Sequence, residues 1–262
     1  MLFKKSSEVM SQKNCSVFYN NCNYFSAFLE EEYLRKGDLL LIGGRRLMGS
    51  SKLALYMALK FAEKEREVLY FDLEENKNHP EERLKNMLQR LEEYRNKGKT
   101  ASEALQEPRK LLKGIRMDSE PVNSYQELET RIKEKTKAGA IVFIDDLESL
   151  RPLRGLKIKD RNKEGGPIIK NLKLLAAEKK ILLIVLVHVS RKCEHREPPK
   201  AIISDFRKQE LWKIPDHIWF VFREWYYNRD GSNETEITIA KSRNSGVIRI
   251  KPFPDIISVS YL

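Results

Sequence analysis

A short glycine-rich segment between two apolar stretches most constrains how this chain can fold. The segment GGRRLMGSS, residues 43–51, follows the apolar run 39–42 and precedes 53–62, where apolar side chains recur at helical spacing. An uninterrupted apolar run is typical of a parallel strand that is buried on both faces. The sequence therefore predicts a strand, a tight loop and a helix in direct succession, which is how a parallel α/β unit begins.

The loop matches most of a phosphate-binding pattern. In the P-loop pattern G-x-x-x-x-G-K-[ST], Gly44, Gly49 and Ser51 occupy the glycine and hydroxyl positions, but Ser50 stands where the lysine belongs. That lysine normally reaches the β- and γ-phosphates as a positive charge. Backbone N–H groups at a helix N-terminus can hold an anion without it. The alternative interpretation is a plain glycine turn that joins a strand to a helix.

Composition limits the class of protein. The chain has 262 residues, 41% of them hydrophobic, with no internal repeat and no low-complexity linker, so one large α/β domain is the simplest organisation. No stretch approaches the roughly 20 apolar residues of a membrane span, and the N-terminus lacks the apolar core of a secretory signal. The three cysteines, Cys15, Cys22 and Cys193, form no C-x-x-C pair, and we expect a reducing, cytoplasmic location.

The net charge of +11 favours a polyanionic partner, nucleic acid first, over a merely basic protein. Two basic segments are candidates for that contact. They are 151–166, predicted as a glycine-containing loop, and a second loop from 191 to 207. Neither holds an aromatic residue well placed for base stacking, so binding would be mainly electrostatic.

The remaining pattern predicts a mostly parallel central sheet with helices on both faces and a C-terminal antiparallel extension. The predicted parallel strands cover 39–42, 68–71, 140–144, 181–187 and 217–222; the antiparallel ones cover 236–240, 247–250 and 256–260. Helices are predicted over 25–34, two or three times within 79–137 with breaks near 96–100 and 118–123, and over 168–180.

Carboxylates follow two of the predicted parallel strands. Asp72 and Glu74 follow the strand at 68–71, and Asp145 and Asp146 follow the strand at 140–144. Ligands of open α/β sheets bind beyond these carboxyl ends. An aspartate there can hold Mg²⁺, and a glutamate can polarise a water molecule. Capping of a following helix is the alternative role for each of them.

The order of motifs resembles the RecA-like motor domain of DnaB-type replicative helicases, over residues 15–262, with 1–14 as an N-terminal arm. The matching segments are GDLLLIGGRRLMGSS, VLYFDLEE, IVFIDDLESL, ILLIVLVHVSRKCEHRE, the SDFR region and ITIAKSRNSG. The resemblance implies a RecA-like P-loop NTPase fold, ATP with Mg²⁺, single-stranded DNA as a partner and a role in DNA replication. It also implies a ring or filament of identical subunits, or association with a replicative helicase, and no membrane.

The resemblance assigns roles to particular residues. The catalytic set is Glu74, Asp145, His188 at the position of a sensing glutamine, and Lys241 and Arg243, which act in trans in the family. The nucleotide set is Gly44, Arg45, Arg46, Met48, Gly49, Ser50 and Ser51, with Ser51 and Asp145 linked to Mg²⁺. The nucleic-acid set is Arg151, Arg154, Lys157, Lys159, Arg161, Lys163, Arg191, Lys192 and Arg196.

The departures from the family pattern leave the chemistry open. Ser50 replaces the P-loop lysine, His188 replaces the glutamine, and the family's N-terminal collar domain has no counterpart in the sequence. We expect a DnaB-like protein with weak nucleotide binding and impaired or absent hydrolysis, that is, a pseudo-ATPase. The alternatives are an active ATP-dependent helicase in which Arg45 or Arg46 compensates for the lysine, and a recombinase-like filament protein.

Overall fold

An eight-stranded sheet forms the centre of the computed structural model, which describes residues 29–73, 82–89, 111–150, 158–206, 210–231, 235–242 and 248–250. The strand order is β3-β2-β4-β5-β1-β6-β7-β8. The strands are β1 (Leu39–Gly44), β2 (Val68–Asp72), β3 (Ile115–Asp118), β4 (Ile141–Asp145), β5 (Leu182–His188), β6 (His217–Arg223), β7 (Thr235–Lys241) and β8 (Ile248–Ile250). All pairings from β3 to β6 are parallel.

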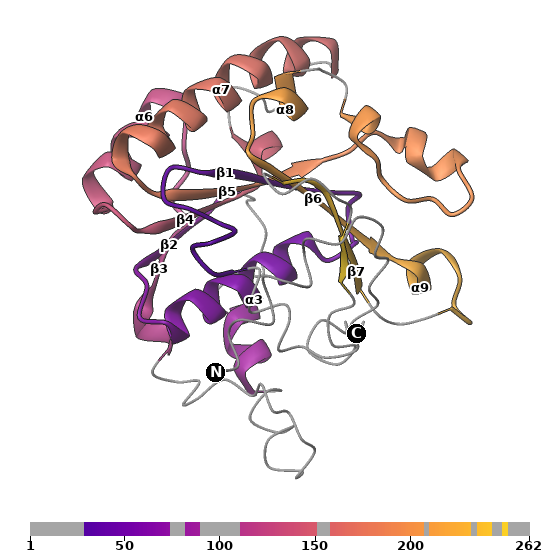
Figure 1. Cartoon of the computed structure of the whole chain (residues 1–262), viewed down its shortest axis with the longest axis horizontal. Coiled ribbons are helices and arrows are strands. Elements are labelled where there is room, and N and C mark those ends of the chain that lie inside the picture. Colours follow the sequence, from indigo (N-terminus) through magenta and orange to yellow (C-terminus); the bar gives the residue numbers. More distant parts are fainter. Residues whose placement is uncertain are drawn as a thin grey trace.

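Helices cover both faces of the sheet (Figure 1). The α-helices are α3 (Ser50–Glu63), α6 (Tyr125–Lys135), α7 (Ile158–Lys179), α8 (Glu210–Lys213) and α9 (Glu224–Tyr227), and residues 82–89 are also helical. The 3₁₀ turns are η1 (Leu112–Gly114), η2 (Leu147–Ser149), η4 (Arg191–His195) and η5 (Ile203–Asp205). Within the described ranges, no helix has the length and apolar character needed to cross a membrane.

Strand β1 shows why the central strands read as unbroken apolar runs. Leu40 and Ile42 pack on the face covered by α3, whereas Leu39 and Leu41 pack on the face covered by α6 and α7. All four side chains are completely buried. A strand with two buried faces needs apolar residues at every position, which removes the alternation seen in half-exposed strands.

The strand order creates a switch point between β5 and β1. The chain leaves β1 toward β2 on one side of the sheet and leaves β5 toward β6 on the other side. Gly44 and His188 are register partners at the carboxyl ends of these two strands. Ligand sites in open α/β sheets form at such a point, so the topology places the glycine loop and His188 at one candidate site.

The antiparallel extension carries one irregularity. β7 pairs with β6, and β8 pairs with β7, both antiparallel. Ile218 pairs with Lys241 but its neighbour Trp219 pairs with Ile239, so Ala240 is an extra residue in β7. This is the pattern of a β-bulge, which re-aims the side chains beyond it.

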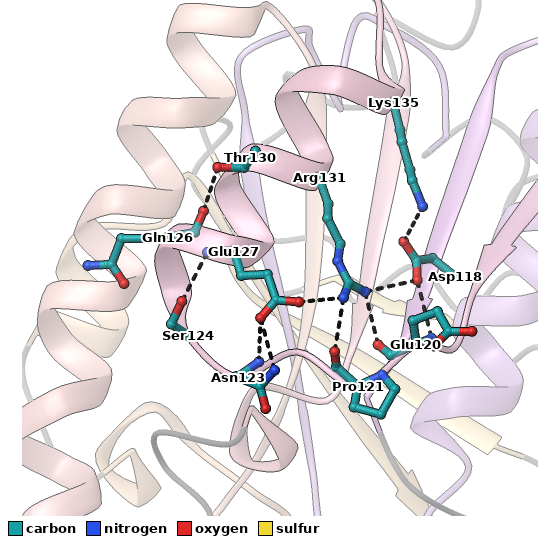
Figure 2. A network of polar contacts seen from close by, with 10 residues as sticks. All are labelled: Asp118, Glu120, Pro121, Asn123, Ser124, Gln126, Glu127, Thr130, Arg131 and Lys135. Atoms are coloured by element: carbon teal, nitrogen blue, oxygen red, sulfur yellow. Dashed lines mark hydrogen bonds and ion pairs between the residues drawn. The ribbon is translucent and has the colours of Figure 1, made fainter.

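The edge strand β3 is tied to α6 by a polar network (Figure 2). The buried Asp118 carboxylate pairs with Arg131 at 3.3 Å and with Lys135 at 2.7 Å. Arg131 also donates to the backbone oxygens of Glu120 at 3.1 Å and Pro121 at 3.0 Å. One arginine thus fixes the turn between strand and helix.

Most of the predicted elements are confirmed. Two predictions are wrong, and one strand was missed. The predicted loop 151–166 is wrong over 158–166, because α7 begins at Ile158 and continues through Pro167. The strand β3 was not predicted, because two of its four residues, Arg116 and Asp118, are charged. Residues 29–34 form turns rather than the predicted helix. The remainder of that helix and the strand at 256–260 lie outside the described residues.

Candidate functional site

The glycine loop begins where the backbone packs too tightly for a side chain. A Cβ atom on Gly43 would lie 2.8 Å from the Phe220 ring, and one on Gly44 would lie 2.6 Å from Ser50 Oγ. At the end of the loop, Gly49 has a φ of 93°, which glycine adopts without strain. Gly49 is therefore required by the backbone conformation, whereas a side chain on Gly44 would have to displace the Ser50 hydroxyl.

The N-terminus of α3 opens onto this loop. Gly49 is the capping residue and provides no side-chain hydrogen bond, and the first turn contains no acidic residue. The first N–H groups of a helix lack partners within the helix, and its dipole places partial positive charge there. The start of α3 can therefore bind an anion such as a phosphate.

Ser51 and Asp145 come together as the sequence predicts. Ser51, in the first turn of α3, donates from its Oγ to Asp145 Oδ1 at 3.1 Å. Tyr70 from β2 donates to the other carboxylate oxygen at 2.7 Å. Asp145 is 4% exposed. Two hydrogen bonds thus fix both oxygens of this carboxylate beside the loop.

Burial raises the pKa of Asp145 to about 7, although hydrogen bonds from Tyr70 and Ser51 oppose the shift. The negative charges of Asp146 and Asp72 add to the rise. Near neutral pH the carboxyl group is therefore close to its titration midpoint. A cation bound beside it would favour the ionised form.

The position of the missing lysine is filled by a short side chain. Ser50 Oγ lies on the side of Gly44 where a side chain would stand, because a Cβ built there would be 2.6 Å from it. Arg45 points elsewhere, because its Nε bonds Glu194 Oε1 at 2.8 Å and its Nη1 bonds the Val189 oxygen at 3.4 Å. Arg46 is exposed. Of the two arginines, only Arg46 is free of an ion pair within the part of the chain that the structure describes.

Met48 contributes to the loop through its backbone. Its side chain is 1% exposed and belongs to the core beneath α3. Its N–H bonds the Arg45 oxygen at 3.2 Å, which closes a turn within the loop. The side chain of Met48 therefore packs in the core. The predicted contact of Met48 with a nucleotide stays a prediction, and it would involve the backbone.

His188 forms a buried charged cluster with two carboxylates. Its Nε2 lies 2.8 Å from Asp146 Oδ2. Burial opposes the charged imidazolium, but contact with Asp146 and the charge of Glu148 outweigh it and raise the pKa of His188 to about 9. Burial together with the charge of Asp146 raises the pKa of Glu148 to about 7. The position predicted for a sensing residue thus carries a histidine tied to the end of β4.

Lys241 is bonded within its own chain. Its Nζ donates to the backbone oxygens of Trp212 at 3.0 Å, Lys213 at 2.8 Å and Pro215 at 2.5 Å. These oxygens lie at and just beyond the C-terminus of α8, where a cation is favourable. Burial lowers the pKa of Lys241. In this arrangement the amine caps a helix end within its own chain, and its action in trans stays a prediction.

The second basic segment is held together by an aspartate. Asp205 is 3% exposed and pairs with Arg196. It also accepts a hydrogen bond from the Ile202 N–H at 2.8 Å. Arg196 is therefore engaged in its own loop, while Arg191 and Lys192 at the start of η4 are exposed.

Several predicted site residues lie outside the described residues. They are Glu74, Arg243, Arg151, Arg154 and Lys157. The backbone of Lys159, Arg161 and Lys163 lies in the first turns of α7 instead of a loop.

Tyr70 and Glu148 were missed as site residues. Tyr70 was missed because it stands among apolar residues in a strand, where an aromatic residue is expected to belong to the core. The sequence signal that could have identified Tyr70 is its position two residues before Asp72, because this strand is the neighbour of the strand that ends in Asp145.

The chain is similar to known helicase domains over most of its length. The family model described as "DnaB-like helicase C terminal domain" matches residues 31–252. A "Probable replicative DNA helicase" of Trieres chinensis is 28% identical over 266 residues, which cover 94% of this chain and 57% of that protein. The "Replicative DNA helicase DnaB" of Geobacillus stearothermophilus is 33% identical over 140 residues, or 51% of this chain and 30% of that protein. The chain thus spans 57% or less of either relative.

Solved structures show the same fold. One, described as an "ATPase Domain", matches with a TM-score of 0.69 at 23% identity, covering 98% of this chain and 95% of that chain. A structure of "A DnaB-Like Replicative Helicase And Its Interactions With Primase" matches with a TM-score of 0.69 at 23% identity, covering 95% of this chain and 64% of that chain.

Proposed function

This chain belongs to the DnaB-like helicase C-terminal domain family, and from that premise we propose that it acts in DNA replication as a nucleotide-responsive, DNA-binding domain. It binds single-stranded DNA and ATP with Mg²⁺, and it hydrolyses ATP poorly or not at all. Subunits associate with one another or with a replicative helicase. The proposal depends most on one observation, the short, uncharged Ser50 side chain at the position of the P-loop lysine.

The residues present fit a magnesium–nucleotide complex. The hydroxyl of Ser51 and the carboxylate of Asp145 are 3.1 Å apart, and oxygen ligands of this kind suit Mg²⁺. The metal-bound nucleotide would supply the phosphoryl group for hydrolysis. Ser51 and Asp145 hold the metal, and the N–H groups at the start of α3 hold the phosphates.

Loss of the lysine affects turnover more than binding. A charge-assisted hydrogen bond contributes about 1.5–3 kcal/mol, and more where charge develops in the transition state. The backbone of the loop still binds phosphates when the lysine is absent, so the nucleotide binds weakly. Each 1.4 kcal/mol changes a rate about tenfold, so we expect turnover at least about a hundredfold below that of a competent helicase.

The test is a titration of the full chain with a fluorescent ATP analogue, with and without single-stranded DNA, followed by size measurement and an ATPase assay. We expect weak binding with little hydrolysis in the natural chain and a gain of turnover in Ser50→Lys. Ser50→Ala is the matched control, because it changes the same position without adding charge. Robust DNA-stimulated hydrolysis by the natural chain would rule out the proposed impairment.

An active helicase with a compensating arginine is the second candidate, and the exposure of Arg46 favours it. Arginine suits the geometry of phosphate oxygens. If Arg46 compensates, Arg46→Gln abolishes the remaining turnover. Arg45→Gln serves as the comparison, because Arg45 already pairs with Glu194. Equal activity in Arg46→Gln and the natural chain would eliminate this candidate.

A further inference from the structure

We propose that Asp146, Glu148 and His188 form a site for a divalent transition-metal ion of the Zn²⁺ class, separate from the Ser51–Asp145 magnesium site. The three residues come from the end of β4, from η2 and from the end of β5. One ligand atom from each of them lies within 4.8 Å of the other two. It is the only such group of His, Cys, Asp or Glu among the residues that the structure describes.

The two carboxylates are already positioned by backbone hydrogen bonds. Asp146 Oδ1 accepts from the Ser149 N–H at 2.8 Å, and Glu148 Oε1 accepts from the His188 N–H at 3.0 Å. Each carboxylate therefore has one oxygen held by the backbone and one left for the cluster. Such supporting hydrogen bonds orient metal ligands and strengthen binding.

The remaining ligand atoms lie within 4.8 Å of one another in a partly buried site. Glu148 Oε2 is buried and makes no hydrogen bond to any described residue. His188 Nε2 and Asp146 Oδ2 are 2.8 Å apart. That distance is typical of an ion pair. Two ligands of a tetrahedral ion with bond lengths of about 2.0–2.2 Å lie about 3.3–3.6 Å apart, so the pair would open slightly around a bound ion. A buried polar atom without a partner is costly, and a bound ion would satisfy Glu148 Oε2.

The ligand chemistry selects the class of ion. Imidazole nitrogen favours Zn²⁺, Cu²⁺, Fe²⁺ or Ni²⁺ over Mg²⁺, which prefers oxygen alone. One nitrogen and two carboxylate oxygens leave at least one position of a tetrahedral Zn²⁺ for water. A bound ion would join the carboxyl ends of β4 and β5, next to the loop that follows β1.

The experiment uses the full chain after chelator treatment and dialysis, without nucleotide. Zn²⁺ is titrated calorimetrically, and Co²⁺ replaces it for visible absorption. We expect one equivalent of Zn²⁺ to bind, and we expect His188→Gln and Glu148→Gln to weaken binding by at least about tenfold. Asp145→Asn should retain Zn²⁺ binding, which separates this site from the magnesium site. His195→Gln, an exposed histidine, is the matched control and should bind like the natural chain.

Thermal unfolding in chelator shows whether each variant folds. In the natural chain, the ring resonances of His188 should move on addition of Zn²⁺ while those of His195 and His217 stay in place. This measurement needs no variant, so it still decides the matter if a substitution prevents folding. The proposal would be overturned if both His188→Gln and Glu148→Gln bound Zn²⁺ as tightly as the natural chain. It would also be overturned if the site bound Mg²⁺ as tightly as Zn²⁺.

Discussion

At the residue scale, tight backbone packing explains the composition of the glycine loop. Gly43 lies against two aromatic rings: a Cβ there would lie 2.8 Å from Phe220 and 3.0 Å from Phe206. Those rings contact each other with centroids 5.2 Å apart, so neither has room to withdraw. Gly43 stands just outside the phosphate-binding pattern, yet its neighbours leave no room for a side chain.

Gly43→Ala should therefore destabilise the fold by about 1–3 kcal/mol, the usual cost of overpacking a core. Urea unfolding measures the change. The double variant with Phe220→Leu should recover part of the loss, because the smaller side chain frees the space that the new methyl group needs. Additive effects of the two substitutions would show that the predicted clash does not exist.

Lys241 provides the second residue-scale prediction. Lys241→Met should lower the free energy of unfolding by about 1–3 kcal/mol, because three backbone oxygens lose a charged donor. Calorimetric melting of the natural chain and the variant measures this. Lys213→Met, close by on α8, is the matched control. Unchanged stability together with lost subunit association would instead support a role in trans.

At the element scale, the joint between β3 and α6 depends on a single buried carboxylate. Asp118→Ala removes the partner of both Arg131 and Lys135. We expect a loss of about 1–3 kcal/mol, and faster hydrogen exchange in β3 and the first turn of α6 than in β1 or β4. Lys135→Met is the milder control, because that lysine is 44% exposed. Uniform exchange across the sheet would contradict this local role.

Elements were predictable from the sequence where burial leaves a simple pattern. The run Leu39–Ile42 could be nothing but a buried strand, because both of its faces are covered. β3 lies at the edge of the sheet and tolerates Arg116 and Asp118, so its pattern is not apolar. The start of α7 was hidden by Gly165, Gly166 and Pro167, which usually break helices. The apolar side chains by which α7 packs on the sheet begin only after these residues, at Ile168.

The candidate site was predictable only where its residues belong to short motifs at the ends of the buried strands. Ser51 and Asp145 belong to short motifs whose strands are neighbours in any sheet of this type. The partners of Arg45 and Lys241 are not encoded nearby, since Glu194 lies 149 positions from Arg45. Such contacts depend on the tertiary arrangement of the loops, which a short sequence pattern does not predict.

At the scale of the whole molecule, the net charge of +11 should govern association with single-stranded DNA. The affinity should fall steeply with salt concentration. Replacing the exposed Arg191 and Lys192 by Gln should reduce the slope of log K against log salt by about 2, or about 1 per residue. Anisotropy titrations of two unrelated oligonucleotides should show equal losses of affinity.

Arg196→Gln is the comparison, because Arg196 already pairs with Asp205. A slope unchanged by the double substitution would remove η4 from the DNA interface.

The extra residue at Ala240 has a consequence for how the chain tolerates length changes. Ile237 and Ile239 face the core beneath α3, and strict alternation would send Lys241 to that same apolar face. The bulge turns the strand, so the amine instead reaches the oxygens after α8, on the opposite face of the sheet. Deleting Ala240 would place Lys241 directly after Ile239, where ordinary alternation already sends its side chain to the face of α8, so this deletion should leave the helix cap in place. The bulge thus allows Ile239 and Lys241, two positions apart, to place their side chains on opposite faces of the sheet.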